Sequence, residues 1–210
     1  MNILTFNANP MDQNIYLCHD AKSAVLIDAG CSQADIAAIM QTLEQQDLTL
    51  MAILLTHGHG DHILAVQELK QRTNVAICAH AAECAILSNP AWNLSGRFGT
   101  DIVIAPDITF EGGATLNFGN LSFKTLHTPG HTAGGTCYYD AAGGNLFVGD
   151  TIFKGSIGRT DLPTGDEATL LQSIADKILT LSNNTNLYPG HGEATTIADE
   201  KAHNPYCSSQ

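Results

Sequence analysis

THGHGDH, residues 56–62, carries four side chains of metal-ligand type within six consecutive positions, and two glycines fill the gaps between them. The preceding residues 51–55 (MAILL) form a short apolar run that is typical of a buried strand. The following residues 63–70 place apolar side chains at 63, 66 and 69, a spacing that favours a helix. The ligand-type residues therefore lie in a loop between a strand and a helix, where functional residues are concentrated.

The spacing inside this loop predicts two metal sites. His57 and His59 are two residues apart, so in extended backbone their imidazoles point to the same side and can share one ion. Asp61 and His62 come after the turn, where adjacent side chains at the start of a helix diverge toward a different point. The glycines permit a tight turn and keep bulky side chains out of the cavity.

A structural interpretation of the same residues is available. A single histidine is more often a structural residue than a ligand, and Asp61 alone could serve as a helix N-cap. We favour the metal interpretation because imidazole and carboxylate groups are preferred zinc ligands and four of them occur together.

Composition limits the class of protein. The 210 residues are 44% hydrophobic and 14% charged, which predicts one compact domain over residues 1–210. A formal charge of -12 argues against nucleic-acid partners and anionic membrane surfaces. The chain has no apolar run of membrane-spanning length and no signal-peptide pattern, so we expect a cytoplasmic protein. Its six cysteines are expected to be buried thiols.

The rest of the chain alternates short apolar strands with helices. We expect strands at residues 2–8, 14–18, 24–27, 51–55, 75–78, 135–139, 145–148 and 187–189, and two or three antiparallel strands within 109–125. The first two strands form a hairpin around the turn residues Asn9 and Pro10. We expect helices at 33–46, 63–72, 81–87, 166–181 and 196–203, and a loop at 89–101.

Three further ligand-type residues follow the pattern of the central loop. His131 lies in TPGHT (128–132), Asp150 follows LFVG (146–149), and His191 lies in YPGHG (188–192). Each alone would be an ordinary turn residue, but all three come just past a short apolar strand and next to glycine. If these strands lie side by side, one rim of the sheets gathers five histidines and two carboxylates.

Asp28 is a further residue of interest, because it ends the apolar run 24–27. Two interpretations stay open for it. It could accept a hydrogen bond from a metal ligand, or it could be an ordinary turn aspartate.

THGHGDH, TPGHT, LFVGDT and YPGHG, in that order, resemble the motifs of the metallo-β-lactamase-fold hydrolases, over nearly the whole chain. The resemblance implies an α/β (α+β) fold, a four-layer αβ/βα sandwich of two mixed β-sheets flanked by helices. It also implies two divalent metal ions, one on His57, His59 and His131, a second on Asp61, His62 and His191, with Asp150 bridging both. Zinc is the first expectation for the metal, with iron and manganese as alternatives.

Within this family the chain is similar to short single-domain glyoxalase II-type enzymes (hydroxyacylglutathione hydrolases), particularly in GDTIFKGSIGRTDLPTGD, residues 149–166. The longer glyoxalase II proteins carry a C-terminal helical region that helps bind glutathione, and residues 1–210 are expected to lack it. The resemblance implies cleavage of a thioester such as S-lactoylglutathione by a metal-bridging hydroxide. Asp61 and Asp150 are the catalytic carboxylates expected to accept the proton of the attacking water.

Substrate recognition has two candidates in the glycine-rich loop after Asp150. Lys154 and Arg159 could hold a substrate carboxylate. The alternative for Arg159 is a structural ion pair with Asp161. The expected partner is a small-molecule thioester, such as a glutathione conjugate, and the sequence leaves the oligomeric state open.

Two other functions compete with thioester hydrolysis. GRTD, residues 158–161, is shared with the persulfide dioxygenases of the same fold, which implies a mononuclear iron oxidoreductase as one alternative. A non-enzymatic metal-binding protein is the other. The complete set of seven ligand-type residues argues against it, since a scaffold has no use for every ligand.

Overall fold

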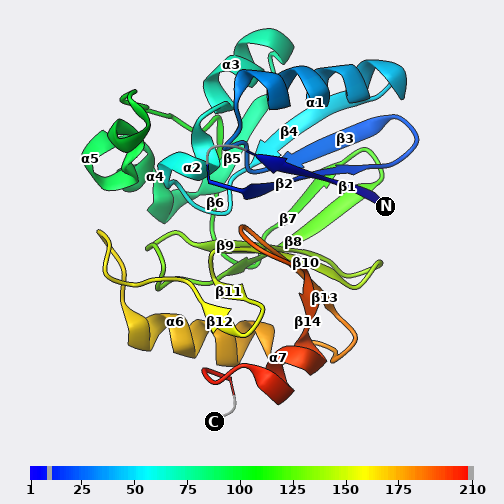
Figure 1. Ribbon diagram of the computed structural model, residues 1–210. Coiled ribbons are helices and arrows are strands. Elements are labelled where there is room, and N and C mark those ends of the chain that lie inside the picture. Colours follow the sequence, from blue (N-terminus) through cyan, green and yellow to red (C-terminus); the bar gives the residue numbers. More distant parts are fainter. Residues whose placement is uncertain (9–10, 208–210) are drawn as a thin grey trace.

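Two mixed β-sheets lie face to face, with helices on the outer side of each. The computed structural model describes residues 1–8 and 11–207. Figure 1 shows the four layers in order: α1 and α3, the first sheet, the second sheet, and then α6 and α7. The architecture is therefore the αβ/βα sandwich that the sequence predicted. The predicted turn at Asn9 and Pro10 falls outside the described residues.

The N-terminal half of the chain builds the first sheet, in the order β1-β2-β3-β4-β5-β6. Its strands are β1 (Asn2–Ala8), β2 (Gln13–His19), β3 (Ser23–Ile27), β4 (Thr49–Leu54), β5 (Ala76–His80) and β6 (Ile108–Phe110). The first three strands are antiparallel, whereas β3 to β6 are parallel. Parallel neighbours need crossover connections: α1 lies between β3 and β4 and α3 between β4 and β5, both on the outer face of the sheet.

The C-terminal half builds the second sheet, in the order β14-β13-β10-β9-β8-β7. Its strands are β7 (Thr115–Phe118), β8 (Leu121–His127), β9 (Thr136–Asp140), β10 (Asn145–Gly149), β13 (Asn186–Pro189) and β14 (Thr195–Thr196). β10 and β13 are parallel and the other neighbours are antiparallel. β11 (Ile152–Phe153) and β12 (Ser156–Ile157) form a small separate hairpin just after β10.

The helices are short apart from α1. They are α1 (Gln33–Gln45), α2 (Gly60–Ile63), α3 (Val66–Thr73), α4 (Cys84–Leu87), α5 (Pro90–Asn93), α6 (Glu167–Ser173) and α7 (Ile197–His203). Single turns of other helix types are η1 (Ala81–Glu83), η2 (Ser95–Phe98) and the π-helical η3 (Ile174–Ile178). Ser32 and Asp35 form a capping box that starts α1. None of the helices in the described part of the chain is long and apolar enough to cross a membrane.

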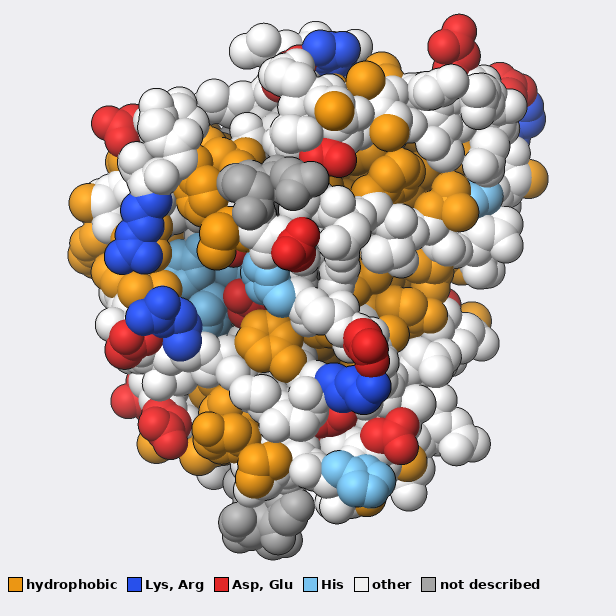
Figure 2. Space-filling view, viewed as in Figure 1, with side chains coloured by type: hydrophobic (Ala, Val, Ile, Leu, Met, Phe, Trp, Pro, Cys, Tyr) orange, Lys and Arg blue, Asp and Glu red, His pale blue; other side chains and the backbone are white. Residues whose placement is uncertain are grey.

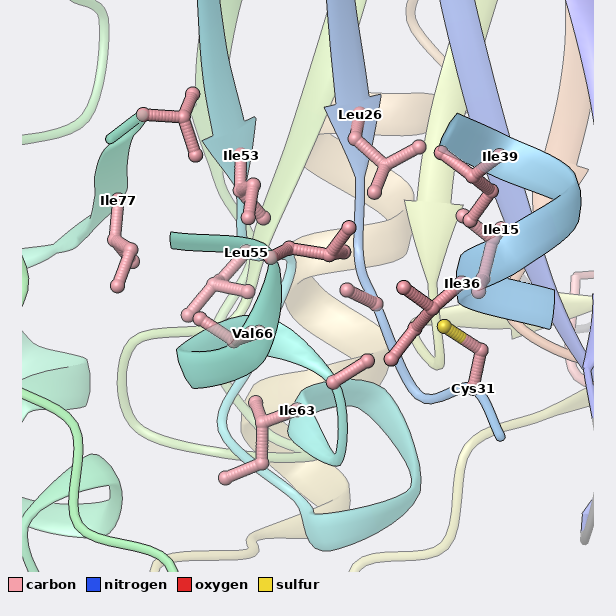
Figure 3. Close-up of a cluster of buried hydrophobic side chains, with 14 of the residues drawn as sticks. Ile15, Leu26, Cys31, Ile36, Ile39, Ile53, Leu55, Ile63, Val66 and Ile77 are labelled. Atoms are coloured by element: carbon pink, nitrogen blue, oxygen red, sulfur yellow. The ribbon is translucent and has the colours of Figure 1, made fainter. Parts of the chain in front are cut away.

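Apolar side chains fill the three spaces between the four layers. Successive residues of a strand face opposite sides, so Leu26 of β3 packs under α1 while Val25 and Ile27 face the second sheet. Figure 3 shows the outer cluster, where Leu26 of the sheet lies next to Ile39 of α1, and Ile53 lies on the side of Leu55 and Val66. Burial on both faces explains why the central strands read as continuous apolar runs.

The predicted loop at 89–101 was wrong in part, because the structure contains α5 and η2 there. Asn89 caps α5 by accepting a hydrogen bond from the backbone N–H of Ala91, and Pro90 occupies the first turn. The expected antiparallel set in 109–125 was also wrong in part: β7 and β8 are antiparallel, but β6 joins the first sheet in parallel with β5.

Candidate metal centre

All seven residues that the sequence singled out as ligands gather at one rim of the sandwich. The residues lie just past the ends of β4, β8, β10 and β13, so the strand-end pattern reflects real proximity. Their side-chain atoms form overlapping groups with ligand atoms within 4.8 Å of one another: His57, His59 and His131; His57, His62 and Asp150; Asp61, His62 and His191.

One group consists of three buried imidazoles from two loops. His59 Nδ1 lies 2.9 Å from His131 Nε2, although the two residues are 72 positions apart in the chain. The rings of His57 and His131 meet edge to face with centroids 4.7 Å apart. Three nitrogens that converge in this way match the trigonal base of a tetrahedral metal site.

The group of Asp61, His62 and His191 is nearer the surface. His191 Nε2 lies 3.2 Å from Asp61 Oδ2 and 3.4 Å from His62 Nε2. His62 also belongs to a group with His57 and Asp150, and its ring centroid lies 4.1 Å from that of His57. The central loop therefore contributes side chains to all three groups, and their division between two ions stays a prediction.

Asp150 lies between the group that holds His131 and the group that holds His191. Its carboxylate oxygens are 3.3 Å from His62 Nε2 and 3.8 Å from both His131 Nε2 and His191 Nε2. Burial opposes its ionisation, but the charge and hydrogen bond of His62, with His131 and His191, outweigh burial, so the pKa of Asp150 lies below its usual range. A buried carboxylate in contact with both groups can bridge two cations.

The protonation states and unpaired atoms fit cations at this rim. Burial, reinforced by neighbouring imidazoles, lowers the pKa of His57 well below 6.5 and that of His59 to about 3, so both rings are neutral ligands. His57 Nε2 is buried without a hydrogen-bond partner among the described residues. Buried polar atoms normally have partners, and a metal ion would supply one here.

His62 differs from the other buried imidazoles. Burial favours its neutral form, but Asp150, Asp28 and Asp61 outweigh burial and raise the pKa of His62 well above its usual range. The imidazole must lose its proton before Nε2 can bind a cation. Metal binding is therefore coupled to proton release.

Asp28 contacts a predicted ligand, which favours the first of its two interpretations. His62 Nδ1 donates to Asp28 Oδ2 at 2.8 Å, and Thr56 donates to the same carboxylate through its backbone N–H and its hydroxyl. His131 Nδ1 likewise donates to the carbonyl oxygen of Arg159 at 2.7 Å. Such partners fix the ring orientation and leave the Nε2 atoms facing the centre.

At two positions in the motifs a residue larger than glycine would collide with its neighbours, and at one of them the backbone conformation also favours glycine. Gly149 has a φ of 49°, and a Cβ there would lie 2.4 Å from Thr56 Oγ1. A Cβ at Gly190 would lie 2.3 Å from Asp150 Oδ1 and 2.6 Å from His62 Cε1. These contacts explain why glycine accompanies the ligands at these two strand ends.

The loop of His191 is held by the first sheet, which sequence reasoning did not predict. Asn14 of β2 donates to the carbonyl oxygens of Pro189 and Gly192 at 3.1 and 2.8 Å, and the Tyr16 hydroxyl donates to Pro189 at 2.6 Å. The chain separation of these pairs exceeds 170 residues, so no local pattern signals them.

Glu83 is a second residue that sequence reasoning missed. Its buried carboxylate accepts hydrogen bonds from the backbone N–H of Gly58 at 2.8 Å, the Thr132 hydroxyl at 2.9 Å and the backbone N–H of Gly134 at 2.8 Å. Gly58 lies between His57 and His59, and Thr132 follows His131. One side chain therefore joins the two loops that carry the three-imidazole group.

Glu83 gives the metal-free protein a testable pH dependence. Desolvation raises the pKa of Glu83 to about 7 from 4.5, even though its three hydrogen bonds favour the charged form. A raised pKa contributes stability that is fully present below about pH 4.5 and is lost as the pH rises through about 7. Glu83→Gln copies the protonated side chain and should lack this loss.

We expect the free energy of unfolding of the chelator-treated wild type, relative to Glu83→Gln, to fall by about 3 kcal/mol from pH 4.5 to pH 8. Urea unfolding of both proteins at the two pH values measures the difference. Parallel pH profiles for the two proteins would contradict the raised pKa.

A cavity of about 240 Å³ opens above the centre. Its lining combines four predicted ligands with apolar and basic side chains: Met11, His59, Asp61, Leu94, Arg97, Phe98, His131, Asp150, Arg159 and Leu162. Figure 2 shows pale-blue histidine surface in a hollow bordered by hydrophobic side chains and by Lys or Arg side chains. A small molecule that enters this cavity reaches the predicted ligands directly.

The two predicted substrate-binding residues differ in position. Arg159 lines the cavity, but its Nε and Nη2 each donate to Asp161 at 2.7 Å, which is the ion pair that the sequence left as the alternative. Lys154 lies outside the lining of this cavity and donates to Glu193 at 2.5 Å. Their roles in binding stay predictions.

Comparisons with known proteins agree with this geometry. The chain is 37% identical to hydroxyacylglutathione hydrolase GloC of Haemophilus influenzae, over 100% of both chains. It superposes on the crystal structure of the BLEG-1 B3 metallo-beta-lactamase with a TM-score of 0.91, at 39% identity over 99% of this chain and 100% of that one. It superposes on TTHA1623 in a di-iron-bound form with a TM-score of 0.85, at 34% identity over 97% and 99%.

The family is settled by a match over most of the sequence. The model of the Metallo-beta-lactamase superfamily covers residues 8–191, which include every ligand-type residue discussed above. Because that match agrees with the four-layer fold, this chain belongs to the metallo-beta-lactamase superfamily of metal-dependent hydrolases.

Proposed function

We propose that this chain hydrolyses a thioester such as S-lactoylglutathione to a hydroxy acid and a free thiol. The observation that supports the proposal most is the position of Asp150, within 4 Å of three imidazoles from both ligand groups, in the lining of an open cavity. The similarity to a hydroxyacylglutathione hydrolase over the full chain supports the substrate class.

In this proposal the seven residues hold two ions at adjacent sites. The ligands would be His57, His59 and His131 for one ion, Asp61, His62 and His191 for the other, and Asp150 for both. When bound, such ions lower the pKa of a water molecule toward about 7 and polarise the carbonyl that it attacks.

The carboxylates then have a role beyond holding the ions. Burial opposes the ionisation of Asp61, but His62 and His191 outweigh burial and lower its pKa, so both Asp61 and Asp150 are charged at neutral pH. Each can accept the proton of the attacking water. A thiol with a pKa of about 8.5 leaves as the thiolate without a strong general acid.

Two other activities compete. BLEG-1 is named a B3 metallo-beta-lactamase, so a β-lactam is a second candidate substrate. The GRTD stretch at 158–161 keeps an iron-dependent persulfide dioxygenase as a third. A non-enzymatic metal-binding role would leave all three substrates unchanged.

We expect zinc as the metal, because mixed imidazole and carboxylate ligands suit it. The di-iron form of TTHA1623 supports iron as the alternative, and manganese is compatible with the same donors. A cytoplasmic location stays a prediction.

The test is turnover of three substrates with metal content measured on the same sample. We expect cleavage of S-lactoylglutathione without oxygen, followed by loss of thioester absorbance, in protein that holds about two metal ions per chain. Little turnover of a β-lactam and no oxygen uptake with glutathione persulfide should accompany it. Oxygen uptake with one iron per chain, or β-lactam cleavage alone, would overturn the proposal.

A further inference from the structure

Arg97 lines the same cavity as the predicted ligands, and neither the motifs nor the proposed function uses it. It belongs to η2, and its neighbours Leu94 and Phe98 form apolar parts of the lining. Figure 2 shows Lys or Arg side chains at the border of the histidine-lined hollow. The cavity therefore combines a metal centre, an apolar wall and basic side chains.

Most basic side chains of this acidic protein are already neutralised. Five of the nine Lys and Arg residues pair with carboxylates: Lys22, Lys70, Arg72, Lys154 and Arg159. Within residues 1–8 and 11–207, Arg97 makes neither an ion pair nor a side-chain hydrogen bond. Of the two arginines in the cavity, Arg159 donates to Asp161 through Nε and Nη2, so its charge is already paired, whereas the charge of Arg97 is not paired within the described residues.

The backbone that carries Arg97 is fixed against the metal loop. A Cβ on Gly60 would lie 2.9 Å from both Ser95 Cα and Phe98 Cε2, so η2 packs directly on the turn between His59 and Asp61. The position of the Arg97 backbone relative to the loop of His59 and Asp61 is thus set by close packing.

Two buried polar side chains hold the other side of this segment. Asn93 donates to the carbonyl oxygen of Ile102 at 2.8 Å, and the backbone N–H of Ile102 donates to Ser95 Oγ at 2.8 Å. Asn93 also accepts from the backbone N–H of Ser95 at 2.9 Å. An arginine on a backbone that is held in place loses less freedom on binding than one on a mobile loop.

We propose that Arg97 binds a carboxylate of the substrate and makes the protein selective for anionic thioesters. The planar guanidinium matches a carboxylate with two parallel hydrogen bonds, and the wall of Leu94 and Phe98 excludes water from part of the contact. The carboxylate can belong to the thiol carrier or to the acyl group. This inference rests on the proposed thioesterase function.

The experiment compares three thioesters: S-lactoylglutathione, the uncharged lactoyl thioester of N-acetylcysteamine, and the succinyl thioester of N-acetylcysteamine. We expect Arg97→Ala to raise KM for the anionic substrate about 10- to 100-fold, with kcat within about threefold, because a hydrogen-bonded charge pair is lost. KM for the uncharged thioester should not change. Whichever anionic substrate shows the effect identifies the side that carries the carboxylate.

Matched variants separate binding from folding. Arg72→Ala removes an exposed arginine that pairs with Glu68 on α3, and it should leave all KM values unchanged. Arg97→Lys keeps the positive charge but cannot make two parallel hydrogen bonds to one carboxylate. It should therefore bind the anionic thioester more tightly than Arg97→Ala and less tightly than wild type. Arg159→Ala tests the predicted alternative, and a larger KM effect there than at Arg97 would overturn the inference.

Failure of this inference differs from failure of the proposed function. An Arg97→Ala protein that cleaves charged and uncharged thioesters as wild type does, or that loses both equally, overturns the role of Arg97 and leaves the thioesterase intact. If wild type cleaves no thioester, calorimetry of the binding of glutathione and of the succinyl thioester to the metal-loaded protein still tests Arg97. Equal affinities of wild type and Arg97→Ala for glutathione and for the succinyl thioester would then overturn it.

Discussion

Asp150→Ala is expected to lower thioester turnover by about a thousandfold or more and to reduce metal content from about two ions per chain to one or fewer. The Asp150 carboxylate is the contact that both ligand groups share, at 3.3 Å from His62 and 3.8 Å from His131 and His191. Its removal leaves Asp61 as the only carboxylate among the predicted ligands and leaves no bridging anion. Loss of a Lewis acid costs several kcal/mol of transition-state stabilisation, which is the source of this magnitude.

Metal analysis and initial rates on the same preparation measure the effect. Asp47→Ala is the matched control, because Asp47 is an exposed carboxylate that pairs with Lys22 away from the cavity. It should keep both metal content and rate. An Asp150→Ala protein that retains two ions and full turnover would contradict the bridging role, and one that retains the ions without turnover would restrict Asp150 to proton transfer.

The residues gathered in the centre could be predicted because each follows a strand that ends at the same rim. A short apolar run followed by a ligand-type residue next to a glycine is a local pattern, and it occurs at His57, Asp150 and His191. The fold aligns those strand ends, so local pattern and spatial proximity coincide. The boundaries of α1 and α7 were predicted for a similar reason, since helical spacing and capping residues are also local.

The residues that support the centre could not be predicted in this way. Glu83 accepts from Gly58 and Gly134 across 25 and 51 positions, and Asn14 reaches Gly192 across 178. A single acidic residue in a short helical segment resembles an ordinary exposed one until the packing is known. Arg97 was missed because glycines and a proline marked 89–101 as a loop, whereas buried hydrogen bonds of Asn93 and Ser95 order it.

Metal removal should cause the largest change in stability. An ion that binds only the folded chain adds about 4 kcal/mol per site when its free concentration is a thousandfold above Kd. For a chain of 210 residues, each kcal/mol shifts Tm by about 2–4 °C. Chelator-treated protein should therefore melt at least about 10 °C below zinc-loaded protein, with the difference measured by differential scanning calorimetry.

The physical reason lies in what the metal-free centre leaves unpaired. His57 Nε2 is buried without a hydrogen-bond partner in the described part of the chain, and an ion supplies the missing partner. His57→Ala should lose at least half of the zinc-dependent shift, whereas His203→Ala, at an exposed position on α7, should keep it. Equal melting temperatures with and without zinc would mean that the imidazole of His57 is satisfied without metal, and the metal centre would then be wrong.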